Sequence, residues 1–165
     1  MHAAFGVLVG LCILTAAFLY FGPLSVLVGR RDLLATVHLW SGLAAPVPLA
    51  LGLLSGAFRD DVRRLERFDD LDRRWLRSPR RRSLPVDRFN AGQKLNAAFS
   101  VGAVLVLLGT GVVMAGLLVN APDDVRTGAT FVHDWVALGL TVAVAGHLYF
   151  VRRYGRGDAT RRRIG

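Results

Sequence analysis

The chain has 165 residues, a formal net charge of +9 at pH 7 and a hydrophobic fraction of 53%. Its 21 Lys and Arg residues are separated along the chain from the apolar residues. This segregation argues against a soluble basic fold, so we expect no nucleic acid partner. The single cysteine, Cys12, excludes an internal disulfide bond.

Four apolar runs follow one another along the chain, and each is long enough to cross a bilayer as a helix of about 20 residues. They cover residues 3–21, 33–57, 95–119 and 131–151. No run alternates between apolar and polar residues with a period of two, as a strand would. We therefore predict an all-α fold, a four-helix transmembrane bundle in one membrane domain over residues 1–165. Because membrane helices tolerate proline, we expect only a kink at Pro46 and Pro48.

The connections between the runs predict the orientation of the chain, because Lys and Arg are enriched in cytoplasmic loops. Loop 58–94 holds eleven Arg and one Lys, and the tail 152–165 holds six Arg. The other two connections hold only three Arg. We therefore expect both termini, loop 58–94 and tail 152–165 to be cytoplasmic, in a multi-pass protein of a bacterial-type inner (plasma) membrane.

Apolar residues recur at steps of three or four within loop 58–94. These residues are Val62, Leu65, Phe68, Leu71 and Trp75. Their spacing predicts a short amphipathic helix on the inner membrane surface, with the arginines toward anionic lipid. A solvated charged loop is the alternative interpretation. Pro79 and Pro85 are expected to end any helix in this part of the chain, and no internal repeat is evident.

All four histidines, His2, His38, His133 and His147, lie inside or at the edge of an apolar run. An ionisable residue within a membrane is costly and marks a functional site. The predicted orientation sorts the four into an outer pair, His38 and His133, and an inner pair, His2 and His147. His147 follows His133 by fourteen positions, which correspond to roughly 21 Å of helix and bring both side chains to within about 40° of one direction.

Two imidazoles at one depth in an apolar surrounding predict the axial ligation of haem. A structural zinc site takes four nitrogen or sulfur ligands, and a proton relay uses carboxylates, of which only Asp134 lies near a histidine in a run. A hydrogen bond to a backbone carbonyl explains one such histidine better than four at two matched depths. We therefore expect two haems b that carry electrons, without an open iron position and with no catalytic residue on the chain.

The segment 88–94, which reads RFNAGQK, opens the third run. Together with the histidine spacing in the fourth run, it resembles the cytochrome b (gamma) subunit of membrane-bound formate dehydrogenases. That subunit falls within the broader group of di-haem cytochromes b of hydrogenases and thiosulfate reductases. The resemblance covers nearly the whole chain and implies that the outer and inner histidine pairs each hold one haem. It also implies a basic stretch before the first histidine, so we expect residues to precede Met1.

The same resemblance implies partners and a substrate. The partners are the iron–sulfur and molybdopterin subunits of an oxidoreductase complex, which would carry out formate oxidation, and the substrate is a quinone. Asn90, Gly92 and Gln93 would lie near the quinone head group, since side-chain amides hydrogen-bond carbonyl oxygens. Capping of the helix start by Asn90 and Gln93 is the alternative.

We therefore expect a membrane-anchoring subunit that transfers electrons between a peripheral, formate dehydrogenase-like enzyme and the quinone pool. Quinone reduction is the one reaction that this subunit could carry out. Two alternatives remain open. One is a hydrogenase- or b561-type cytochrome b, and the other is a membrane scaffold without a cofactor.

Overall fold

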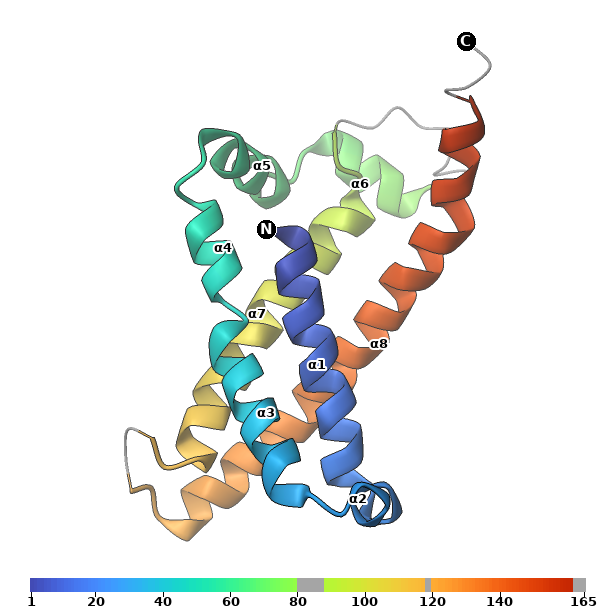
Figure 1. Cartoon of the computed structure of the whole chain (residues 1–165). Coiled ribbons are helices and arrows are strands. Elements are labelled where there is room, and N and C mark those ends of the chain that lie inside the picture. Colours follow the sequence, from blue (N-terminus) through green and yellow to red (C-terminus); the bar gives the residue numbers. More distant parts are fainter. Residues whose placement is uncertain (80–87, 118–119, 162–165) are drawn as a thin grey trace.

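The computed structural model describes residues 1–79, 88–117 and 120–161, with the side chains of 154–161 excepted. Within these ranges every regular element is an α-helix (Figure 1). Four helical segments are long and apolar enough to cross a membrane: His2–Tyr20, Arg31–Gly52, Ala91–Met114 and Asp123–Arg153. The predicted all-α bundle with four transmembrane helices is thus confirmed.

The first span, α1 (His2–Tyr20), is followed by a short helix that the apolar pattern does not predict, α2 (Gly22–Val28). Pro23 lies in the first turn of α2, where its missing amide hydrogen costs no hydrogen bond. Gly29 ends α2 with a φ of 66°, a left-handed conformation that glycine adopts without strain. Figure 1 shows α2 at the end of the bundle opposite to the N-terminus.

The second span consists of α3 (Arg31–Ala44) and α4 (Val47–Gly52). The regular helix is interrupted between them at Ala45 and Pro46, where we expected a kink. A proline has no amide hydrogen and crowds the carbonyl four residues earlier, which breaks the regular pattern of bonds. The amide of Ala45 accordingly donates to the carbonyl of Gly42, three residues earlier, at 3.3 Å.

Two helices, α5 (Gly56–Glu66) and α6 (Asp70–Arg77), occupy the part of loop 58–94 for which we expected one amphipathic helix. The expectation of a single helix is wrong because a second helix begins after Asp69. The Asp69 carboxylate accepts a hydrogen bond from the backbone amide of Asp72, and the Asp72 side chain accepts one in return. This reciprocal capping starts a new helix. The expected effect of Pro85 lies outside the described residues.

The third and fourth spans are α7 (Ala91–Met114) and α8 (Asp123–Arg161). Helix α7 begins four residues before the predicted run, because Asn90 caps it. Helix α8 extends beyond the predicted run at both ends, into the sequence that we assigned to the tail. The predicted end of the third run at 118–119 and the last four residues of the tail lie outside the described residues.

The helices pack mainly as two hairpins, α1 against α3 and α7 against α8. Their shared core is formed by small and medium-sized apolar side chains, namely Val9, Ala103, Val104 and Leu140. Many larger apolar side chains on the spans point outward, as in a bundle that lies in lipid. In Figure 1 the N-terminus, α5, α6 and the end of α8 lie at one end of the bundle, as an even number of crossings requires.

Candidate functional site

The four histidines come together in two pairs inside the bundle. The rings of His38 on α3 and His133 on α8 lie with their centres 6.2 Å apart. The rings of His2 on α1 and His147, also on α8, lie 5.9 Å apart. These are the outer and inner pairs that we expected, and α8 contributes to both. Their role as ligands stays a prediction.

The separation of the rings matches that of two imidazoles on opposite sides of one metal. Two metal–nitrogen bonds of about 2.0 Å, plus about 1.1 Å from each nitrogen to its ring centre, place the ring centres about 6.3 Å apart. Imidazoles in direct hydrogen-bonded contact would lie closer together than this. Among the residues that the structure describes, no three His, Cys, Asp or Glu side chains converge on a common point, so each pair offers two ligands only.

His38 is held by acceptors on α1. Its Nδ1 lies 2.9 Å from Oγ1 of Thr15 and 3.2 Å from the carbonyl oxygen of Cys12. A carbonyl oxygen only accepts hydrogen bonds, and the Thr15 hydroxyl already donates to the carbonyl of Leu11 at 2.7 Å. The hydrogen of the His38 ring therefore belongs on Nδ1, and Nε2 keeps the lone pair that a metal requires.

His133 is held in the same way by α7. Its Nδ1 lies 2.9 Å from Oγ1 of Thr110. The Thr110 hydroxyl donates to the carbonyl of Val106 at 2.8 Å. Both outer histidines thus present Nε2 as a neutral ligand nitrogen. Neither threonine was predicted, because a threonine bonded within its own helix has no recognisable sequence signal until the neighbouring helix is in place.

A cavity of about 330 Å³ lies between α1, α3, α7 and α8 and is lined by both outer histidines. Its wall is largely apolar and includes Gly42 and Gly111, where the helix backbones reach the cavity. Its volume is at the lower end of the range of about 300–1,000 Å³ for small-molecule pockets. Two neutral imidazole nitrogens in an apolar slot are the donor set that a haem b requires, so the residues present fit the group.

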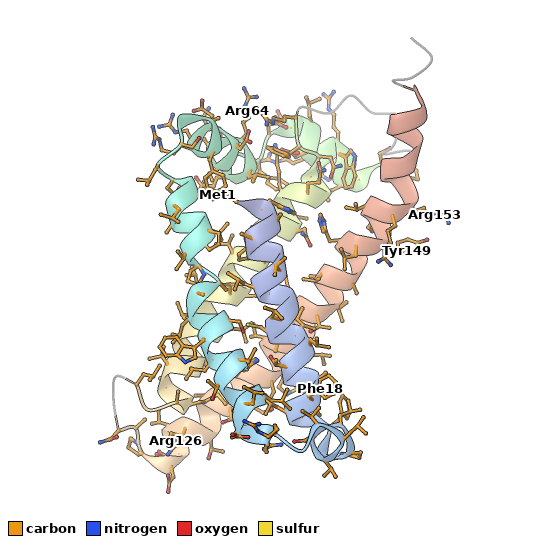
Figure 2. The ribbon with its side chains drawn as sticks, in the orientation of Figure 1. Met1, Phe18, Arg64, Arg126, Tyr149 and Arg153 are labelled. Carbon is orange, nitrogen blue, oxygen red and sulfur yellow. The ribbon has the colours of Figure 1, made fainter. Side chains whose placement is uncertain are left out.

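The inner pair has different surroundings. Both of its side chains are exposed, whereas His38 and His133 are half-buried. Within the described part of the chain, the rings of His2 and His147 make no hydrogen bond. Figure 2 shows Met1 and Tyr149, which are close neighbours of this pair in the sequence, toward the end of the bundle where α5 and α6 lie.

The residues expected near a quinone form the start of α7. The Asn90 side-chain oxygen accepts from the amide of Gln93 at 3.0 Å, and the Gln93 side-chain oxygen accepts from the amide of Asn90 at 2.9 Å. The capping role is therefore present, and it leaves the side-chain NH₂ groups as donors. Gly92 faces Trp75 of α6 so closely that a Cβ would lie 3.1 Å from the indole ring, which explains the glycine by packing.

A buried ion pair fastens α6 to the same end of α7. Lys94 Nζ lies 2.6 Å from Oδ2 of Asp72, and both side chains are at most 5% exposed. Lys94 also donates to the carbonyl of Arg67 at 2.9 Å. Burial alone would raise the pKa of Asp72, but the hydrogen bonds from Lys94 and from the Asp69 backbone outweigh it and hold the pKa below its ordinary value. The sequence contained no signal that paired these two residues.

One family model, described as prokaryotic cytochrome b561, matches residues 1–164 of the chain. The match therefore covers all four spans and all four histidines. No curated protein matches the chain.

Proposed function

The chain belongs to the prokaryotic cytochrome b561 family, and from this premise we propose that it carries electrons through two haems between a peripheral oxidoreductase and the quinone pool. Family membership makes it a multi-pass bacterial membrane protein of the b-type cytochromes that take part in electron transfer. It also argues against the scaffold without a cofactor. We propose, beyond family membership, that the chain binds two haems, reacts with quinone and works with a partner enzyme.

The observation that carries the proposal is the separation of the two histidine pairs, 6.2 and 5.9 Å between ring centres. In each pair the imidazoles come from two different helices, so the fold itself sets their separation. The outer pair would hold one haem b and the inner pair the other. Held by these two pairs of histidines, haem b would supply reversible one-electron transfer.

The chain's own residues prepare the outer site for this task. Thr15 and Thr110 fix the ring hydrogens of His38 and His133 on Nδ1. The rings are half-buried and the cavity wall is largely apolar. An apolar, water-poor surrounding is one of the factors that set the potential of such a centre.

We place the quinone at the inner pair's end of the bundle. Support comes from the capping box of α7, which leaves amide NH₂ groups on the half-buried Asn90 and the exposed Gln93. An amide NH₂ group donates to a quinone carbonyl oxygen. In our proposal this end is cytoplasmic, because eighteen of the 21 Lys and Arg residues belong to loop 58–94 and tail 152–165.

The proposed partners are an iron–sulfur subunit and a molybdopterin subunit of a formate dehydrogenase-like complex. Support for them is the segment 88–94, which resembles the gamma subunit of those enzymes. A hydrogenase- or b561-type cytochrome b with another partner is the second candidate, and the description of the matching family favours it. Purification from native membranes in mild detergent separates the two, because only the first brings both subunits along.

The amount of haem in the purified protein tests the proposal. Two bis-imidazole sites require two haems b per chain in a pyridine haemochrome assay. The reduced protein should show an α band of the b type, and reduced quinol should add electrons to it. One haem per chain, or a protein that stays colourless after haem is supplied during expression, would contradict the proposal.

A further inference from the structure

The two threonines that hold the outer histidines occupy equivalent places in two similar hairpins. Thr15 and His38 are 23 residues apart, as are Thr110 and His133. Each threonine precedes its histidine, lies on the neighbouring helix, and bonds Nδ1 at 2.9 Å. The second pair of residues follows the first by 95 positions.

The equivalence extends to other contacts of the two hairpins. Arg31 donates to the carbonyl of Leu19, twelve residues earlier, at 3.0 Å. Arg126, 95 positions after Arg31, donates to the carbonyl of Met114, also twelve residues earlier, at 3.2 Å. The carbonyls of Cys12 and Leu107, which lie 95 positions apart, lie 3.1 and 3.2 Å from the hydroxyl oxygens of Thr15 and Thr110. The α1–α3 and α7–α8 hairpins therefore form an internal repeat, and the prediction that the chain has none is wrong. The sequence itself carries the repeat, since residues 37–40 read VHLW and residues 132–135 read VHDW.

From this geometry we propose that Thr15 and Thr110 are equivalent positioning residues, which orient the outer imidazoles and lower the reduction potential of the haem between them. The inference rests on the proposed binding of haem by His38 and His133. It goes further in naming two residues that touch no haem and act through its ligands.

The direction of the effect follows from the hydrogen bonds. A ligating histidine that donates the hydrogen on its other ring nitrogen becomes a more basic ligand. A more basic ligand favours the more positively charged, oxidised metal and so lowers the potential. Each threonine hydroxyl donates its own hydrogen to a helix carbonyl, at 2.7 Å for Thr15 and 2.8 Å for Thr110. Its oxygen can therefore only accept a hydrogen bond from the histidine.

The inner pair lacks this arrangement among the described residues, since the rings of His2 and His147 make no hydrogen bond there. A change at Thr15 or Thr110 should therefore act on one haem of the two. The other haem serves as an internal reference within the same molecule.

The test is redox potentiometry on purified two-haem protein carrying Thr15→Val or Thr110→Val. Valine keeps the shape of threonine and removes the hydroxyl, which accepts from Nδ1 of the histidine and donates to a carbonyl of its own helix. In each variant we expect the reduction potential of the outer haem to rise. At a fixed ambient potential, its ratio of oxidised to reduced form should fall by about two- to fivefold, because part of the free energy of one hydrogen bond is lost. The two changes should be equal in size, and the inner haem should not respond.

Two controls separate positioning from packing. Thr15→Ser and Thr110→Ser keep the hydroxyl and should restore the wild-type potential. Thr130 on α8 donates to its own helix at 2.9 Å in the same way but bonds no histidine, so Thr130→Val should leave both potentials unchanged. The electron paramagnetic resonance signal of the oxidised outer haem should shift in the valine variants only, because it reports the orientation of the axial rings.

Valine variants that keep two haems and the wild-type potentials would overturn the inference and leave the proposed function standing. Serine variants that shift as much as the valine variants would also overturn it, because packing would then be the cause. A wild-type protein without a haem at the outer pair would overturn the proposed function and this inference together.

Discussion

The outer and inner histidine pairs contain the same residues at nearly the same separation, but their surroundings differ. The outer rings are half-buried, line a cavity, and are held through Nδ1 by a neighbouring helix. The inner rings are exposed, and within the described residues no hydrogen bond holds them. The outer site is thus built into the packing of the hairpins, whereas the inner site lies between the start of α1 and the later part of α8.

The difference indicates which interactions each site depends on. The orientation of the outer rings depends on contacts between α1 and α3 and between α7 and α8. The inner end is stabilised instead by contacts that do not involve its histidines, above all the ion pair of Lys94 and Asp72 and the capping box of α7. Changes to these contacts should therefore affect the inner site and spare the outer one.

The largest effect on the inner end should come from Asp72→Asn. This change removes the charge that compensates Lys94, and breaking a buried ion pair from one side costs about 3–5 kcal/mol. We expect that loss in the free energy of unfolding in detergent, with the inner haem lost before the outer haem during denaturation. Unfolding followed by both the helical signal and the haem absorbance measures this.

Asp70→Asn is the matched control on the same helix. Asp70 pairs with Arg73 at 3.6 Å, and its side chain is 87% exposed, so this ion pair contributes little to stability. If Asp72→Asn destabilised the protein no more than Asp70→Asn, the buried pair would not be what holds the inner end.

A smaller effect should follow from changes at Asn90, which caps α7 and is proposed to bind the quinone. Asn90→Asp keeps an oxygen that accepts from the Gln93 amide but loses the NH₂ donor. We expect quinone reduction to slow by about two- to tenfold, the loss of one hydrogen bond, with little change in stability. Asn90→Ala should show the same slowing and also lose about 1 kcal/mol of stability with the cap.

Steady-state quinone reduction together with thermal unfolding separates the two roles of Asn90. An Asn90→Asp protein that reduces quinone at the wild-type rate would restrict Asn90 to capping. The potential of the outer haem should be the same in both variants, since the outer site is independent of this end.

The four spans and the meeting of the histidines in pairs follow from sequence because both depend on simple regularities. Apolar length gives the spans, and counting residues along the helices gives the depths of His2, His38, His133 and His147. The helix starts were less well predicted, although a signal for one exists. Asn90 and Gln93 have the spacing of a capping box, and we weighed it only as an alternative to quinone binding.

The residues that support the site could not be predicted, for a physical reason. Thr15 and Thr110 satisfy their hydroxyl hydrogens within their own helices, so in sequence they look like ordinary polar residues of a span. Their second role appears only when two helices pack. The internal repeat, by contrast, has a sequence signal that we missed. Residues 37–40 read VHLW and residues 132–135 read VHDW, so three of four residues coincide at the 95-residue offset.

The central claim is that His38 and His133 share one haem, and that His2 and His147 share the other. The most direct test measures the haem content and the electron paramagnetic resonance signals of the oxidised haems in the four single histidine-to-alanine variants. We expect each variant to keep one haem, with the same signal missing from His38→Ala and His133→Ala and the other signal missing from His2→Ala and His147→Ala. Loss of different signals from His38→Ala and His133→Ala would contradict the account.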